Sequence, residues 1–203
     1  GSKPGLEYLG EISWDDISDH MEERDLDLED RGQQEETIGL FLDQLMQRGI
    51  SNVFVNIFDR DGYLYMSSRA LQEAGFRMSE MGDVFAILAS LAAEKDVVLN
   101  VSLEDWAQII YGYKDYSDRI DADLLDKERL SILLEEIARY KQDTGGRLAV
   151  NEEAFAVDWV ALIDERTGEL GLEHYHFFYS PEGYAGHWLT ESYAVHPYDV
   201  EGD

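Results

Sequence analysis

The chain has no cysteine, little lysine and no long apolar run, and each of these shortages excludes a class of protein or site. Without cysteine there are no disulfide bonds, thiolate metal sites or cysteine nucleophiles, which is compatible with the cytoplasmic location that we expect. The longest apolar stretch, Val84 to Ala93, is far shorter than the roughly 20 residues that cross a bilayer. We therefore expect no association with a membrane.

Acidic residues dominate the charge of the chain. There are 44 aspartates and glutamates against 16 basic residues, which gives a formal net charge of −28. Because clustered lysines and arginines supply the affinity for phosphates, direct binding to nucleic acid or anionic lipid is disfavoured. Such a surface attracts basic partners instead, with a strong dependence on salt. Solubility, a high-salt habitat or metal buffering would explain the same charge without a partner.

The carboxylates are densest near the start of the chain, so we divide it into an acidic N-terminal segment, 1–36, and a single α/β domain, 37–203. Ser13 and Asp16 form a capping box, and Trp14, Ile17 and Met21 then fall on one helical stripe. The carboxylates predicted to bind a basic partner are Asp15, Asp16, Asp19, Glu22, Glu23, Asp25, Asp27, Glu29 and Asp30. A solvated helix or loop is the alternative interpretation.

The middle of the chain repeats one pattern three times, an amphipathic helix followed by a strand. Helices are predicted over 34–48, 83–94 and 126–142, and strands over 53–58, 97–101 and 148–151. Buried strands that alternate with amphipathic helices indicate a parallel sheet with crossover helices. A local alternative is a hairpin that turns at 58–63 into a strand over 64–66.

The last fifty residues have a different pattern, rich in aromatic and β-branched residues. Strands are predicted over 157–163, 170–179 and 185–195, with turn sequences at 164–168 and 181–183. This pattern predicts an antiparallel meander. The expected fold is therefore α/β or α+β, with three helix-then-strand units that build a central mixed sheet, finished by a C-terminal antiparallel β-meander.

Histidines gather in the same C-terminal stretch. A hairpin that turns at Glu182-Gly183 would place His174, His176 and His187 on one side, beside Glu191. Imidazoles with a carboxylate suit Zn²⁺ or Fe²⁺, and Gly168, five residues and then His174-Tyr175-His176 resembles the opening of the cupin metal motif. We expect no cofactor, because histidines among aromatic strand residues usually pack in a half-buried surface, and a divalent metal is the alternative.

Polar side chains also follow the predicted strands, at 56–59, 100–104 and 151–153. In parallel α/β sheets and barrels, functional groups gather beyond the carboxyl ends of the strands. Asn151-Glu152 resembles the Asn-Glu pair of retaining glycoside hydrolases with a β/α barrel, and Leu189-Thr190-Glu191 resembles the nucleophile strand of that clan. The resemblance implies that Glu152 and Glu191 are catalytic, one protonating the leaving group and the other attacking the sugar.

Three functional hypotheses follow from the sequence. The leading one is a non-enzymatic acidic protein that binds a basic partner, in an inhibitor, immunity-type or nucleic-acid-mimic role. The second is a glycoside-hydrolase-like enzyme that uses Glu152 and Glu191. The third is a metal-binding protein that uses His174, His176 and His187. No P-loop, glycine-rich dinucleotide turn or nucleophile elbow points to another class of enzyme.

Overall fold

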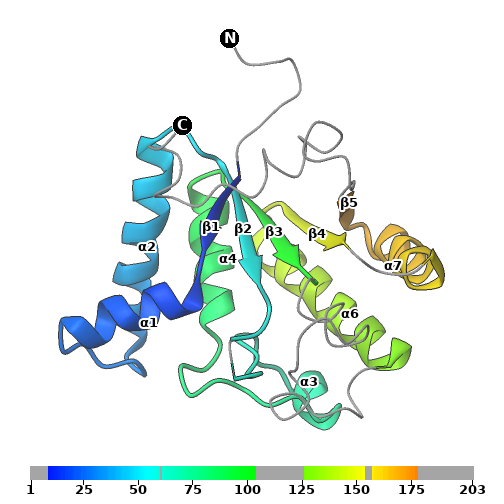
Figure 1. Ribbon diagram of the computed structural model, residues 1–203, viewed down its shortest axis with the longest axis horizontal. Helices are drawn as coiled ribbons and strands as arrows, with labels where there is room; N and C mark the ends of the chain where they lie inside the picture. Colours follow the sequence, from blue (N-terminus) through cyan, green and yellow to red (C-terminus); the bar gives the residue numbers. More distant parts are fainter. Residues whose placement is uncertain (1–8, 60, 104–125, 154–156, 178–203) are drawn as a thin grey trace, which may run out of the picture.

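The computed structural model describes residues 9–59, 61–103, 126–153 and 157–177, and its centre is a five-stranded parallel sheet (Figure 1). Every neighbouring pair of strands is parallel, and the strands lie side by side in the order of the sequence. The strands are β1 (Leu9–Ile12), β2 (Asn52–Asn56), β3 (Val98–Ser102), β4 (Leu148–Glu153) and β5 (Glu173–Phe177).

The helices between these strands are α1 (Trp14–Glu23), α2 (Arg31–Gln47), α3 (Arg69–Glu73), α4 (Val84–Glu94), α6 (Lys127–Thr144) and α7 (Val157–Leu170). Helix α2 packs on α4, α4 on α6 and α6 on α7, so these four helices form one layer. Right-handed crossovers between strands in sequential order place helices on a single face, as in β/α barrels. Among the described helices, none has the length and apolar content needed to cross a membrane.

Side-chain caps mark where four of these helices begin, and the cap of α3 is Ser68. The side chains of Ser13, Asp30 and Asp126 accept hydrogen bonds from backbone N–H groups in the first turns of α1, α2 and α6. Gly145 follows α6 with a φ of 70°, a left-handed conformation that favours glycine and ends the helix. The predicted helices over 34–48, 83–94 and 126–142 are present as α2, α4 and α6.

The two faces of the sheet differ in polarity. Val53, Val55, Leu99, Val101, Leu148 and Val150 alternate along the strands toward the helix layer and are fully buried. On this face Gly10 of β1 lets α2 approach, because a Cβ there would lie 2.6 Å from Cδ2 of Leu45. The opposite face carries Asn56, Asn100, Ser102 and Asn151, and we call it the polar face.

The acidic N-terminal segment contributes to this same sheet and core. It supplies β1, α1 and the first turns of α2. Trp14, Ile17 and Met21 are buried, so the helical stripe predicted for this segment packs into the core, while most of its carboxylates are exposed. The acidic residues therefore lie on the surface of folded elements that pack into the core of the domain.

The predicted mixed sheet and C-terminal meander are wrong. β5 pairs in parallel with β4, and residues 157–163, predicted as a strand, form the first half of α7. Trp159, Ile163 and Thr167 are four residues apart, so they lie on one face of a helix, and this spacing outweighs the strand propensity of the individual residues. The segment predicted as the third strand of the meander, 185–195, lies outside the described residues.

The alternative hairpin at 58–66 is present only as an isolated contact. Phe58 and Leu64 form one antiparallel bridge, and Leu64 forms a parallel bridge with Met78, but 64–66 is not a strand of the sheet. Asp59 closes the turn, since its carboxylate accepts hydrogen bonds from the backbone N–H groups of Asp61 and Tyr63. Because the sheet begins with the strand at Leu9, Asn151-Glu152 falls on the fourth strand.

Candidate functional site

The carboxyl edge of the sheet brings a row of polar side chains together on the polar face. In the strand register Asn56 pairs with Ser102, Ser102 with Asn151, and Asn151 with Tyr175. Residues paired in adjacent parallel strands point to the same face, so these four side chains form a row across β2 to β5. In parallel sheets and β/α barrels this edge is where ligands bind.

Asn151 is the central and most unusual member of this row. It is 1% exposed, and neither Nδ2 nor Oδ1 has a hydrogen-bond partner among the described residues. The Oδ1 atom of Asn56 is likewise buried without a partner. By contrast, Asn100 on the same face donates from Nδ2 to the carbonyl oxygen of Val53 at 3.3 Å. Because an unsatisfied buried polar group costs about 1–3 kcal/mol, the Asn151 amide has unused capacity for a hydrogen-bonding ligand.

A second cluster, which we call the His174 bridge, joins Glu152, His174 and Asp164 on the helix-facing side of the sheet. Nε2 of His174 lies 3.0 Å from Oε1 of Glu152, and Nδ1 lies 3.0 Å from Oδ1 of Asp164 on α7. The side chain of Glu152 is 0% exposed and that of His174 is 7% exposed, whereas Asp164 is 76% exposed. The bridge therefore links β4 to β5 through a buried ion pair and β5 to α7 through the exposed carboxylate of Asp164.

The contacts of His174 define its charge. An imidazole that donates to two carboxylates needs a proton on both ring nitrogens, so the bridge is complete only with imidazolium. Burial by itself lowers the pKa of His174, but the hydrogen bonds and negative charges of Glu152 and Asp164 outweigh burial and raise the pKa above its ordinary value of 6.5. In this arrangement both ring nitrogens face carboxylates.

This raised pKa predicts how stability depends on pH. The contribution of the His174 bridge to the free energy of unfolding is complete below pH 6.5 and is lost as the pH rises through the folded-state pKa of His174. Urea unfolding across this range should show the loss in the wild type and not in His174→Gln. Equal pH dependence of the two proteins would contradict a protonated His174 in the fold.

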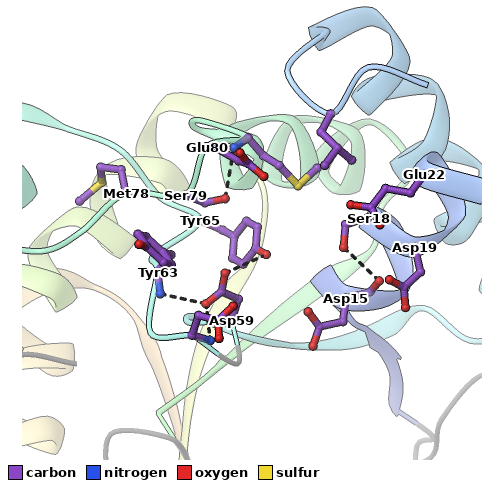
Figure 2. Close-up of a pocket in the computed structure, with 13 residues that line it drawn as sticks. Asp15, Ser18, Asp19, Glu22, Asp59, Tyr63, Tyr65, Met78, Ser79 and Glu80 are labelled. Carbon is purple, nitrogen blue, oxygen red and sulfur yellow. Dashed lines mark hydrogen bonds between the residues drawn. The ribbon is translucent and has the colours of Figure 1, made fainter. Parts of the chain in front are cut away.

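A pocket of about 590 Å³ opens between α1 and the segment that follows β2 (Figure 2). Six carboxylate residues line it, namely Asp15, Asp19, Glu22, Asp59, Asp61 and Glu80, and no basic residue is among its described lining residues. Tyr63, Tyr65 and Met78 supply its aromatic and apolar wall. The pocket thus has the charge and shape to receive a cationic group.

Asp59 connects this acidic pocket to the sheet edge. Burial is the main cause that raises the pKa of Asp59, opposed by hydrogen bonds from the backbone of Tyr63 and Asp61. Tyr65 approaches Asp59 Oδ2 with its hydroxyl at 3.4 Å and stacks on Trp14, with ring centroids 4.6 Å apart. The indole N–H of Trp14 donates to the backbone oxygen of Asn56, which links this wall to the row of polar side chains.

The structure brings part of the predicted partner-binding set together. Asp15, Asp19 and Glu22 line the acidic pocket, while Glu22 also borders a shallower hollow with three further members, Asp25, Asp27 and Glu29. Asp30 accepts the backbone N–H of Gln33 as the N-cap of α2. Asp16 and Glu23 are exposed on α1 and do not line the pocket.

The residues predicted for catalysis and metal binding are only partly described. Glu152 lies at the carboxyl end of β4, but it contacts His174 on the helix-facing side and is closed to solvent. Glu191 and His187 lie outside the described residues, as does the side chain of His176. Among the described side chains, no group of three or more His, Asp or Glu is arranged to hold a metal ion. The three-histidine metal site stays a prediction.

Several residues of these sites were not found from the sequence. Tyr65 and Glu80 reach the acidic pocket from a segment without helical or strand periodicity. No pattern in the sequence therefore indicated that they belong to a site. Asp164 was assigned to a turn, and only its position on α7 reveals it as a partner of His174. The predicted strand over 97–101 ends one residue short of β3, and Ser102 is the residue beside Asn56 and Asn151.

Comparisons of the chain with protein-family models, with curated proteins and with solved structures found no match.

Proposed function

We propose that this chain binds a hydroxyl-rich ligand, of which carbohydrate is the leading class, at the carboxyl edge of the polar face. The observation that carries the proposal is the buried Asn151 amide, which has no partner in the described part of the chain and lies in register with Asn56 and Ser102. Carboxamides both donate and accept, so they pair well with hydroxyl groups that do the same. Tyr175, in the same row and 38% exposed, adds an aromatic surface that can pack on a sugar ring.

The arrangement of the sheet adds support. Strands in sequential order with one helix layer are the pattern of β/α barrels, in which the face opposite the helices is the interior. The Asn-Glu pair that resembles glycoside hydrolases falls on the fourth of these strands. The proposal is for binding rather than hydrolysis, because the carboxylate of Glu152 is held by His174 on the other face of the sheet.

Glycan-array binding of the purified chain tests this function. We expect the wild type to bind one class of oligosaccharide and Asn151→Leu to lose that binding. Asn100→Leu is the matched control, since Asn100 is an equally buried asparagine of the same face whose Nδ2 already has a partner. It should keep binding wherever it stays folded. Equal binding by the Asn151 variant and the wild type, or no binding of any glycan, would contradict the proposal.

A second candidate function, binding of a basic partner, is favoured by the acidic pocket. Its six carboxylates converge on one cavity in which a lysine or arginine side chain would be attracted from every side. Three residues of the predicted partner-binding set, Asp15, Asp19 and Glu22, line this pocket, which supports the leading sequence hypothesis. It ranks second because most of its carboxylates are exposed, whereas the Asn151 amide is buried with no partner among the residues that the structure describes.

Binding of an oligolysine peptide, measured at low and high salt, tests this second function. Asp15 and Asp16 form a matched pair, since both lie in the first turn of α1 and only Asp15 lines the pocket. We expect Asp15→Asn to weaken binding several times more than Asp16→Asn, and salt to weaken both. Equal effects of the two substitutions would show that the peptide responds to net charge and not to the pocket.

A further inference from the structure

Within the described part of the chain, the direction of the Asn151 amide is set by the backbone of β4 and not by hydrogen bonds of its own side chain. Its side chain has no hydrogen-bond partner among the described residues, so its direction depends on the backbone of β4. On one side that backbone is fixed by β3, because the N–H of Leu103 donates to the carbonyl oxygen of Asn151 at 2.9 Å. On the other side it is paired with β5, where Tyr175 is opposite.

The next residue of β4 is anchored far more firmly. Glu152 follows Asn151 directly, and its side chain points to the opposite face, where Nε2 of His174 lies 3.0 Å away. His174 belongs to β5 and contacts Asp164 of α7 through its other nitrogen. A buried carboxylate with a charged partner resists displacement, because leaving that partner would expose an uncompensated charge to the protein interior.

We infer that Asp164, His174 and Glu152 are positioning residues for the Asn151 amide. The His174 bridge fixes the end of β4 from the helix-facing side, and this constraint sets the direction in which Asn151 presents its N–H and C=O groups on the polar face. Sites held within fractions of an ångström need such a supporting layer of contacts. The inference rests on the proposed function, since it concerns the same amide.

Asp164 offers the cleanest test because it is exposed and its loss leaves the buried pair in place. The side-chain NH₂ signals of Asn151, assigned by their absence from Asn151→Leu, are recorded by NMR in the free protein. We expect Asp164→Ala to shift and broaden these signals and to leave those of Asn100 unchanged. Asp164→Asn keeps an oxygen that accepts from His174 and should restore the wild-type signals. Unchanged Asn151 signals in Asp164→Ala would overturn the inference.

The affinity for the best oligosaccharide of the array is the second readout. We expect Asp164→Ala to weaken it about tenfold and Asp164→Asn to restore most of it. Unchanged affinity would overturn the inference even where the NMR signals shift. If no glycan binds the wild type, the proposed function fails, while the NMR signals, which need no ligand, still support or overturn the positioning role.

Discussion

Replacement of His174 by phenylalanine is expected to lower the free energy of unfolding by about 3–5 kcal/mol, a large fraction of the stability of a domain. The phenyl ring fills much of the same space but leaves the carboxylate of Glu152, which is 0% exposed, without its charged partner. The cost therefore comes from the loss of this charged partner and not from lost packing. Urea unfolding below pH 6.5, where His174 is protonated, measures it.

His20→Phe provides the matched control for this substitution. His20 is a partly exposed histidine of α1, packed edge-on against Phe41, and no buried carboxylate depends on it. We expect a change within about 0.5 kcal/mol, as for ordinary surface substitutions. The double variant His174→Phe, Glu152→Leu should recover much of the lost stability, because it removes the charge together with its partner. A loss below about 1 kcal/mol in His174→Phe would show that Glu152 does not need imidazolium to stay buried.

Local signals made the helices predictable. Asp30 and Asp126 mark helix starts with side chains that accept backbone N–H groups, and Gly145 marks an end through its left-handed conformation. The strand that follows each of α2, α4 and α6 is a short run of β-branched and aliphatic residues, which indicates burial on both faces and hence a parallel sheet. Helix ends and buried strands depend on residues that are neighbours in the sequence, so they can be predicted from the sequence alone.

The order and direction of the last strand depend on contacts between distant segments. Trp159 and Val160 favour a strand as single residues, but they lie in α7, whose inner side packs on α6 and β5. Once 157–170 is a crossover helix, β5 must run parallel to β4. A strand there would have made the meander possible, so one wrong assignment produced both errors in the predicted fold.

The candidate site was predictable in its location and not in its geometry. Asn56 and Asn151 follow buried strand patterns, so the sequence places them at the carboxyl edge of a parallel sheet. The face on which each side chain lies depends on the strand register. Asn151 and Glu152 lie on opposite faces because neighbouring residues of a strand alternate. The sequence resemblance treated these two neighbours as one Asn-Glu motif, whereas the structure gives them different surroundings.

Replacement of Asn151 by leucine is expected to raise the free energy of unfolding by about 1–2 kcal/mol, although most core substitutions lower it. Leucine has the same branching as asparagine and no polar atoms, so it removes two buried groups that lack partners among the described residues. Urea unfolding in the absence of any ligand measures this change. The same substitution is the one expected to abolish binding to the glycan array.

Asn100→Leu separates this gain from a general effect of replacing asparagine in the sheet. The side chain of Asn100 is 2% exposed and donates to Val53, so its loss should cost about 1 kcal/mol by leaving that carbonyl with one partner fewer. Opposite signs at Asn151 and Asn100 would mean that, of these two asparagines, only Asn151 is kept at a cost to the stability of the fold, which is the behaviour of a residue retained for its ligand. Destabilisation at both positions would instead mean that the Asn151 amide already contributes to the fold, and the ligand site would lose its main support.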